Sequence, residues 1–97
     1  MDYNISFTQK ARYELLAAKQ FYQRISPLIA ARFVEEATDM CSEISHSPLR
    51  FPEIDPPIRK ALFSRKFPYA ILYSVRETSL IILAVSHQRQ HPDRWKT

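Results

Sequence analysis

Six apolar residues in succession, from Leu80 to Val85, set the strongest limit on how this chain can fold. A strand with one face in water alternates apolar and polar side chains, so an unbroken apolar run predicts a strand covered on both faces. Of the 97 residues, 45% are apolar and 25% are charged, which is typical of a globular chain and not of a disordered one. We therefore expect a single domain over residues 1–97 with this strand in its core.

Two amphipathic helices are predicted before this strand. Apolar residues recur at helical spacing after the capping residue Thr8, at Ala11, Leu15, Ala18, Tyr22 and Ile25. Ser26 and Pro27 then form a signal for the start of a second helix, which extends to about His46. Its apolar face is formed by Ala30, Phe33, Ala37, Met40, Cys41 and Ile44. So tight a connection predicts an antiparallel helical hairpin whose apolar stripes share a core.

Strand-like segments lie on both sides of the hairpin. Residues 3–7 alternate apolar and polar side chains, and residues 47–57 contain four prolines and are predicted to form a loop. Three further strands are predicted at Ile58–Phe67, Tyr69–Arg76 and Leu80–His87. The predicted fold class is α+β, a βααβββ domain with the helical hairpin on one face of a small, mainly antiparallel curved sheet. The other face requires a C-terminal tail at residues 88–97, a second chain, or both.

Several classes of function are excluded by composition. The chain has no glycine, so it cannot carry a phosphate-binding P-loop, a dinucleotide fingerprint or a nucleophile elbow, and no cofactor is expected. Its single cysteine, Cys41, cannot form an internal disulfide, which favours a reducing, cytoplasmic setting. No apolar run approaches the length of a membrane span, so no membrane partner is expected. His87 and His91 have a zinc-like interval, but Pro92 disfavours the helix that would bring them together, and no metal site is predicted.

The positive charge lies in the second half of the chain. Residues 49–97 carry nine basic and four acidic side chains, a net charge of +5, and residues 1–48 carry a net charge of −1. A basic half favours contact with nucleic acid or with an acidic protein. The candidate target-binding residues are Arg59, Arg65, Lys66, Tyr69, His87, Arg89, Arg94 and Trp95. Alternatively, the aromatic rings are partly core and the cations only keep a sheet edge soluble.

The same basic and aromatic residues could also cleave RNA without a metal. A base would activate the 2′-hydroxyl, and Arg or Lys would stabilise the charge that develops on the phosphate. His87 is the histidine that ends a predicted strand beside cations, so it is the candidate general acid or base if the chain is a nuclease.

Several short motifs occur in a specific order over nearly the whole chain. They are the opening strand with the helix motif Ala11-x-x-Glu14-Leu15, then Tyr22, Ser26-Pro27, Ala30-x-x-Phe33, Ser47-Pro48, Arg59, Phe67-Pro68-Tyr69-x-x-x-Tyr73, and Ile82-Leu83-Ala84-Val85-x-His87. In this order and spacing they resemble the ParE/RelE superfamily of bacterial toxins from toxin–antitoxin pairs. The ending His87-x-Arg89-x-x-Pro92-x-x-Trp95 is similar to the ParE branch.

The resemblance implies a toxin that is neutralised by a cognate antitoxin and that meets operator DNA only through this antitoxin. ParE-like members inhibit DNA gyrase by binding, without known catalysis of their own, and this is the function that we expect. RelE-like members cut mRNA on the ribosome, and this metal-independent nuclease activity is the alternative. The lysines and the C-terminal Arg/Tyr pair of the nuclease branch have no convincing counterparts in this chain. A non-toxic member that acts only in a toxin–antitoxin repressor complex is a further alternative.

Overall fold

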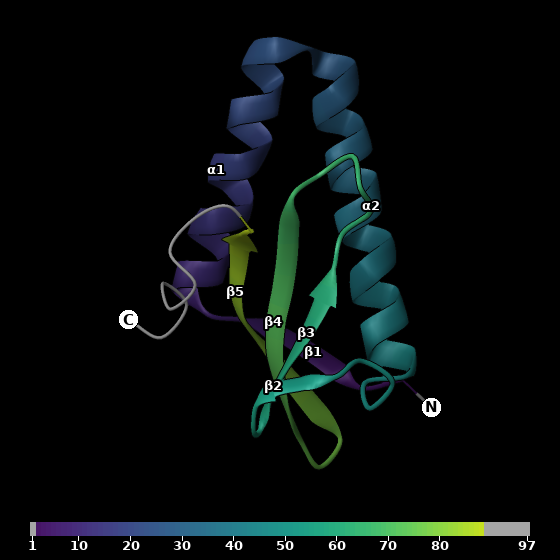
Figure 1. Ribbon diagram of the computed structural model, residues 1–97. Coiled ribbons are helices and arrows are strands. Elements are labelled where there is room, and N and C mark those ends of the chain that lie inside the picture. The colour runs from purple at the N-terminus through teal and green to yellow at the C-terminus, as the bar shows by residue number, and fades with distance from the viewer. Residues whose placement is uncertain (1, 89–97) are drawn as a thin grey trace.

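Two helices form a hairpin (Figure 1), and two capping side chains fix where the helices begin. In this computed structural model, which describes residues 2–88, the Thr8 hydroxyl accepts a hydrogen bond from a backbone N–H in the first turn of α1 (Gln9–Ile25). Ser26 ends α1 by donating its N–H to the carbonyl of Tyr22. Its hydroxyl then accepts from an N–H in the first turn of α2 (Pro27–His46). A single residue separates the helices, and the predicted hairpin is confirmed.

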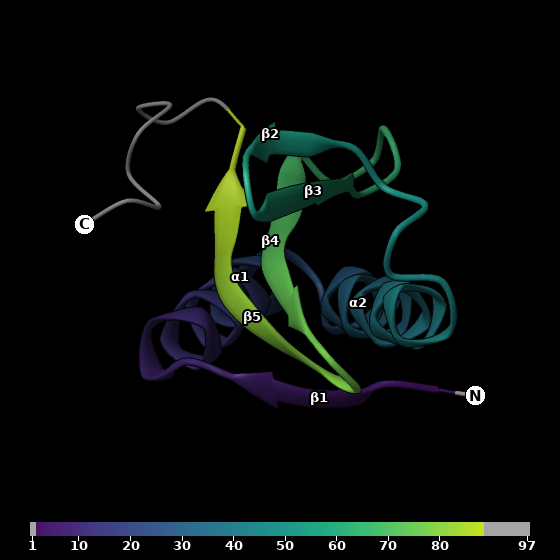
Figure 2. The same ribbon diagram turned by 90° about the horizontal axis from the view of Figure 1, so that it is seen from below.

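The strands of residues 2–88 form one sheet in the order β1-β5-β4-β3-β2. Its members are β1 (Asn4–Phe7), β2 (Glu53–Asp55), β3 (Ile58–Leu62), β4 (Tyr69–Arg76) and β5 (Ser79–His87). β1 pairs with β5 in parallel, and the other pairs are antiparallel. The predicted α+β class and the helical hairpin packed on a mainly antiparallel sheet are confirmed (Figure 2).

Two strand predictions need correction. The proline-rich segment 47–57, predicted as a loop, contains the short strand β2. β2 is an edge strand with an irregular register, and edge positions tolerate neighbouring prolines because one side needs no ladder hydrogen bonds. The strand predicted over Ile58–Phe67 is β3 and ends at Leu62, and residues 63–68 form the connection to β4.

A β-bulge explains the unbroken apolar run in β5. Tyr73 pairs with Ile82 and Leu72 pairs with Ala84, so Leu83 has no partner on β4. The inserted residue shifts the alternation, and Val85 returns to the face on which Ile82 lies. Both side chains are buried there. The apolar run therefore has two causes: β5 lies inside the sheet, between β1 and β4, and the side chains change face at the bulge.

The helical hairpin extends past the end of the sheet (Figure 1). Ala11, Ala18 and Tyr22 of the predicted α1 stripe are buried, and Leu15 is half-buried against them. Ile25 has the same spacing but is 59% exposed, so its assignment to the core was wrong. Spacing sets the direction of a side chain, but the sheet that would cover Ile25 does not reach that far along the helix.

Neither helix in residues 2–88 combines the length and the apolar character needed to cross a membrane.

Candidate functional site

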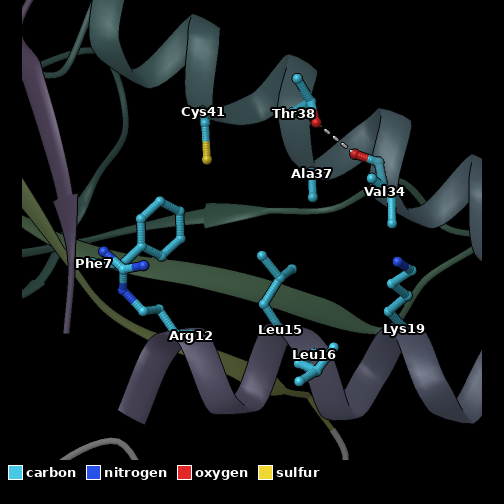
Figure 3. A pocket seen from close by; sticks show the side chains of 9 residues that line it. All are labelled: Phe7, Arg12, Leu15, Leu16, Lys19, Val34, Ala37, Thr38 and Cys41. Atoms are coloured by element: carbon cyan, nitrogen blue, oxygen red, sulfur yellow. Dashed lines mark hydrogen bonds between the residues drawn. The ribbon is translucent and has the colours of Figure 1, made fainter. Parts of the chain in front are cut away.

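An apolar groove lies between α1 and α2, and Phe7 of β1 stands at one end of it (Figure 3). Its volume is about 480 Å³. Leu15 and Ala37 point into the groove from opposite helices, and the small side chain of Ala37 leaves the space between them. The complete lining consists of Phe7, Arg12, Leu15, Leu16, Lys19, Val34, Ala37, Thr38 and Cys41. This shape and lining suit the apolar face of a partner helix or strand.

The groove contains neutral polar side chains and two positively charged ones. The Thr38 hydroxyl donates a hydrogen bond to the carbonyl of Val34 (2.9 Å) and is satisfied within α2. Burial raises the pKa of the Cys41 thiol, so this side chain is a neutral, apolar part of the wall and not a reactive thiolate. Arg12 and Lys19 stand on the α1 side and make that rim positive. An apolar partner segment that carries carboxylates would complement the groove.

A second cleft, of about 410 Å³, lies between α1 and the ends of β4 and β5. It is lined by Tyr13, Glu14, Ala17, Ala18, Phe21, Tyr69, Val85 and His87, and we call it the aromatic cleft. It forms because the β1–β5 pairing stops at Ile82, which leaves one edge of β5 without a strand. Side chains take over that edge: Thr8 Oγ1 donates to the carbonyl of Leu83 (3.1 Å), and Glu14 Oε1 accepts the N–H of Val85 (2.9 Å).

Tyr69 and His87 meet at the end of the aromatic cleft. They are cross-strand partners, and their rings pack edge to face with centroids 5.0 Å apart. Burial, and then the neighbouring Tyr22, raise the pKa of the Tyr69 phenol, which is therefore protonated at neutral pH. Tyr69 can act there as a packing surface or a hydrogen-bond donor, but not as a base.

Arg65 and Lys66 lie in the exposed connection between β3 and β4, on the same end of the sheet as Tyr69. This connection is held at two points. The Glu36 carboxylate accepts hydrogen bonds from Ser64, and the N–H of Gln88 donates to the carbonyl of Pro68 (2.7 Å). The structure thus brings four of the predicted target-binding residues, Arg65, Lys66, Tyr69 and His87, to one end of the sheet.

Arg59 lies apart from these four residues. It pairs with Tyr73, four residues along β4 from Tyr69, which corresponds to about 13 Å along an extended strand. Its guanidinium donates to the carbonyls of Leu49 (3.2 Å) and Phe51 (2.6 Å) and so ties the 47–52 loop to β3. The other predicted target-binding residues, Arg89, Arg94 and Trp95, lie outside the described residues.

Sequence reasoning missed several residues of both clefts. Leu16 and Val34 of the groove, and Tyr13 and Phe21 of the aromatic cleft, are apolar or aromatic residues that lie off the core stripes of their helices. That departure from the amphipathic pattern was the available signal. No signal identified Glu14 as the partner of β5, because this contact joins residues 71 positions apart. Within residues 2–88, no three His, Cys, Asp or Glu side chains gather closely enough to hold a metal ion.

Comparison with known proteins gives a consistent result. The family model described as the ParE toxin of the type II toxin–antitoxin system, parDE, matches residues 5–92. The fold is similar to a chain of the chromosomal ParDE toxin–antitoxin system from P. aeruginosa, with a TM-score of 0.75 and 20% identity over 88% of this chain and 95% of that one. It is also similar to a chain of the toxin–antitoxin complex RelBE2 from Mycobacterium tuberculosis, with a TM-score of 0.57 and 28% identity over 90% of this chain and 99% of that one. No curated protein matches the sequence.

The family model covers almost all of the described chain, and it spans the helices and strands that form both the groove and the aromatic cleft. The chain therefore belongs to the ParE toxin family of type II toxin–antitoxin systems.

Proposed function

We propose that this ParE-family toxin inhibits DNA gyrase by binding to it, and that a cognate antitoxin protein holds it inactive. The observation that carries the antitoxin part is the apolar groove between α1 and α2. A groove of this kind, with Leu16 more than half exposed, leaves apolar surface in water that a permanent partner would cover. The solved structures similar to this chain come from toxin–antitoxin systems, which supports such a partner.

The groove specifies the chemistry of the antitoxin segment. Its walls require a segment with an apolar face, and Arg12 and Lys19 favour carboxylates beside that face. A short acidic chain that folds as it binds meets both requirements. Because the positive rim attracts such a chain over a distance, its association should weaken as the salt concentration rises.

Inhibition by binding is supported by how the cations of the described residues are distributed. A nuclease needs cations that converge on one phosphate in the transition state. Arg59 is engaged with loop carbonyls at one end of β3, whereas Arg65 and Lys66 lie in an exposed turn at the other end. Charges spread over a surface fit an interface with a large partner better than a catalytic centre.

Cleavage of mRNA is the second candidate function, and His87 is the observation that favours it. The imidazole lies in the aromatic cleft against Tyr69, where a nucleotide base could stack beside a ring nitrogen able to act as a general acid or base. The similarity to a chain of the RelBE2 complex is consistent with this candidate.

Two experiments test the proposal. Purified protein is added to a gyrase supercoiling reaction, where inhibition is expected and an unaffected reaction would contradict the gyrase target. The chain is also co-expressed with the product of the adjacent open reading frame. A stable complex that restores supercoiling is expected, and failure of every adjacent product to bind would contradict the antitoxin.

A further inference from the structure

A patch of large apolar side chains is exposed at the tip of the helical hairpin. Phe21, Ile25 and Leu28 are 51%, 59% and 60% exposed. Ile25 and Leu28 lie within two residues of Ser26, which joins α1 to α2, and Phe21 lies about one helical turn before Ile25. The end of the hairpin extends past the sheet, so no strand covers it, and Phe21 borders the ends of β4 and β5 at the aromatic cleft (Figure 1). Since the buried faces of both helices are formed by other side chains, folding does not account for these three.

The tip is also positively charged. Lys19 and Arg24 are exposed on α1 within two residues of Phe21 and Ile25, and residues 15–34 contain no acidic residue. Arg32 lies further along α2 in a cleft with Glu35, Glu36 and Asp39, which balance its charge. A partner that covers the tip therefore gains from acidic groups placed around an apolar contact. A second copy of this chain is a poor partner for the tip. The acidic part of its α2 would supply negative charge, but it exposes no large apolar side chain that could pack against the tip.

The tip is presented by rigid structure. Ser26 caps both helices through its N–H and its hydroxyl, so the chain reverses without a loop of its own. A patch held in place in this way loses little conformational entropy when it binds. Phe21 also lines the aromatic cleft with Tyr69 and His87, so the patch continues into a hollow. A protein with protruding side chains can fill such a hollow, but a flat lipid surface cannot.

We infer that the tip formed by Phe21, Ile25 and Leu28 is the surface with which this toxin binds its protein target, at an acidic site that contains an apolar pocket. The inference rests on the proposed function, and it adds the contact surface and the chemistry of the target site. Antitoxin binding is assigned to the groove, so the two partners depend on different apolar side chains of the same hairpin, and Lys19 adds positive charge to both surfaces.

The test compares two leucines that are equally exposed. Leu28→Glu places a carboxylate in the tip, at a position near the N-terminus of α2 where a negative charge does not oppose helix formation. Leu62→Glu adds the same charge on β3 at a residue 62% exposed and away from the tip. Inhibition of gyrase supercoiling and growth arrest on expression in a bacterial host are measured for both variants and the wild type. Thermal unfolding checks that each variant is folded.

Leu28→Glu is expected to lower inhibition and toxicity at least about tenfold, because anchors at the centre of an interface carry much of its free energy. It should still bind the adjacent gene's product, and Leu62→Glu should match the wild type. A folded Leu28→Glu variant with wild-type potency would overturn the inference. The inference would also be overturned if the wild type self-associates, or binds anionic vesicles, and Leu28→Glu abolishes that binding.

A wrong gyrase target would give a different experimental result from a wrong assignment of the tip. A wild type that arrests growth but leaves gyrase active would contradict the gyrase target, and the growth arrest of Leu28→Glu then decides the role of the tip. A wild type that neither arrests growth nor inhibits gyrase would overturn both.

Discussion

Glu36 of α2 binds Ser64 through both oxygens of its carboxylate: the N–H of Ser64 donates to Oε2 at 2.5 Å and its hydroxyl donates to Oε1 at 2.8 Å. The two residues are 28 positions apart and join the helical layer to the connection between β3 and β4. Arg65 and Lys66 follow Ser64 directly, so this contact fixes where two of the predicted target-binding cations lie.

Glu36→Ala should therefore destabilise the fold. Loss of two hydrogen bonds to a charged group, at a partly exposed site, should cost about 1–2 kcal/mol and lower Tm by roughly 5–10 °C. Glu35→Ala is the matched control, because Glu35 is the neighbouring exposed glutamate and its loss should cost less than about 0.5 kcal/mol. Thermal unfolding followed by circular dichroism measures both, and equal losses would show that the Ser64 contact contributes nothing.

Arg59→Ala should release the 47–52 loop and leave the sheet folded. The substitution removes the donors to the carbonyls of Leu49 and Phe51. Local opening of the loop should become roughly tenfold more frequent, since each hydrogen bond to a charged group stabilises it by more than about 1 kcal/mol. Trypsin cleavage after the exposed Arg50 reports this opening. Arg76→Ala, at an exposed position of β4, should leave the rate unchanged; if it raises the rate equally, Arg59 has no special role in ordering the loop.

The buried Tyr73 phenol makes stability fall in alkali. Burial raises its pKa to about 12, although the nearby Arg59 lowers it, and its hydroxyl donates to the carbonyl of Pro48. An unfolded tyrosine ionises near pH 10, so the unfolded state loses its proton first, and stability falls between about pH 10 and pH 12. The full loss from Tyr73 is about 2.7 kcal/mol.

Urea unfolding at pH 8 and pH 11.5 measures this dependence. Tyr73→Phe should be less stable than the wild type at pH 8, by about 1 kcal/mol, because the carbonyl of Pro48 loses its donor. It should lose less stability on going to pH 11.5, and the other tyrosines act equally in both proteins. Parallel pH profiles would contradict the assigned pKa.

Leu16→Glu should weaken antitoxin binding and leave the target surface intact. Leu16 lines the groove from α1, and a carboxylate there would be buried beneath an apolar partner segment. The Kd for the adjacent gene's product should rise about 100-fold or more, which corresponds to about 2.7 kcal/mol. Leu62→Glu should change it less than about threefold. Equal affinities for the wild type and Leu16→Glu would place the antitoxin elsewhere.

The helices and the two long strands could be predicted because local signals define them. Thr8, Ser26 and Pro27 fix the ends of the helices through contacts within a few residues of each, and the strong strand pattern defines β4 and β5. Ile25 could not be predicted in this way: its spacing placed it in the core, but only the length of the sheet determines what covers it. Likewise, the bulge at Leu83 depends on the pairing between two strands, and the apolar run of β5 alone does not distinguish it from a regular strand covered on both faces.

The candidate site could be predicted less well than the fold. Residue type identified the basic and aromatic set, but nothing local separated Arg59, which holds a loop, from Arg65 and Lys66, which lie in an exposed turn. The groove was missed because it needs the packing of α1 against α2, where the small Ala37 faces Leu15. Each of these features depends on contacts made in the folded chain and not on the pattern of neighbouring residues.

The gyrase target is tested most directly when the same purified protein is offered both gyrase and ribosomes. Wild type and His87→Ala are each added to a supercoiling reaction and to translating ribosomes with a defined mRNA. We expect both proteins to inhibit supercoiling, within about tenfold of each other, and the mRNA to stay intact. A positioned acid or base contributes roughly 10²–10⁴-fold to a rate. If gyrase stays active and the mRNA is cut, and if a folded His87→Ala variant loses cleavage by that factor, the protein is a nuclease and not a gyrase inhibitor.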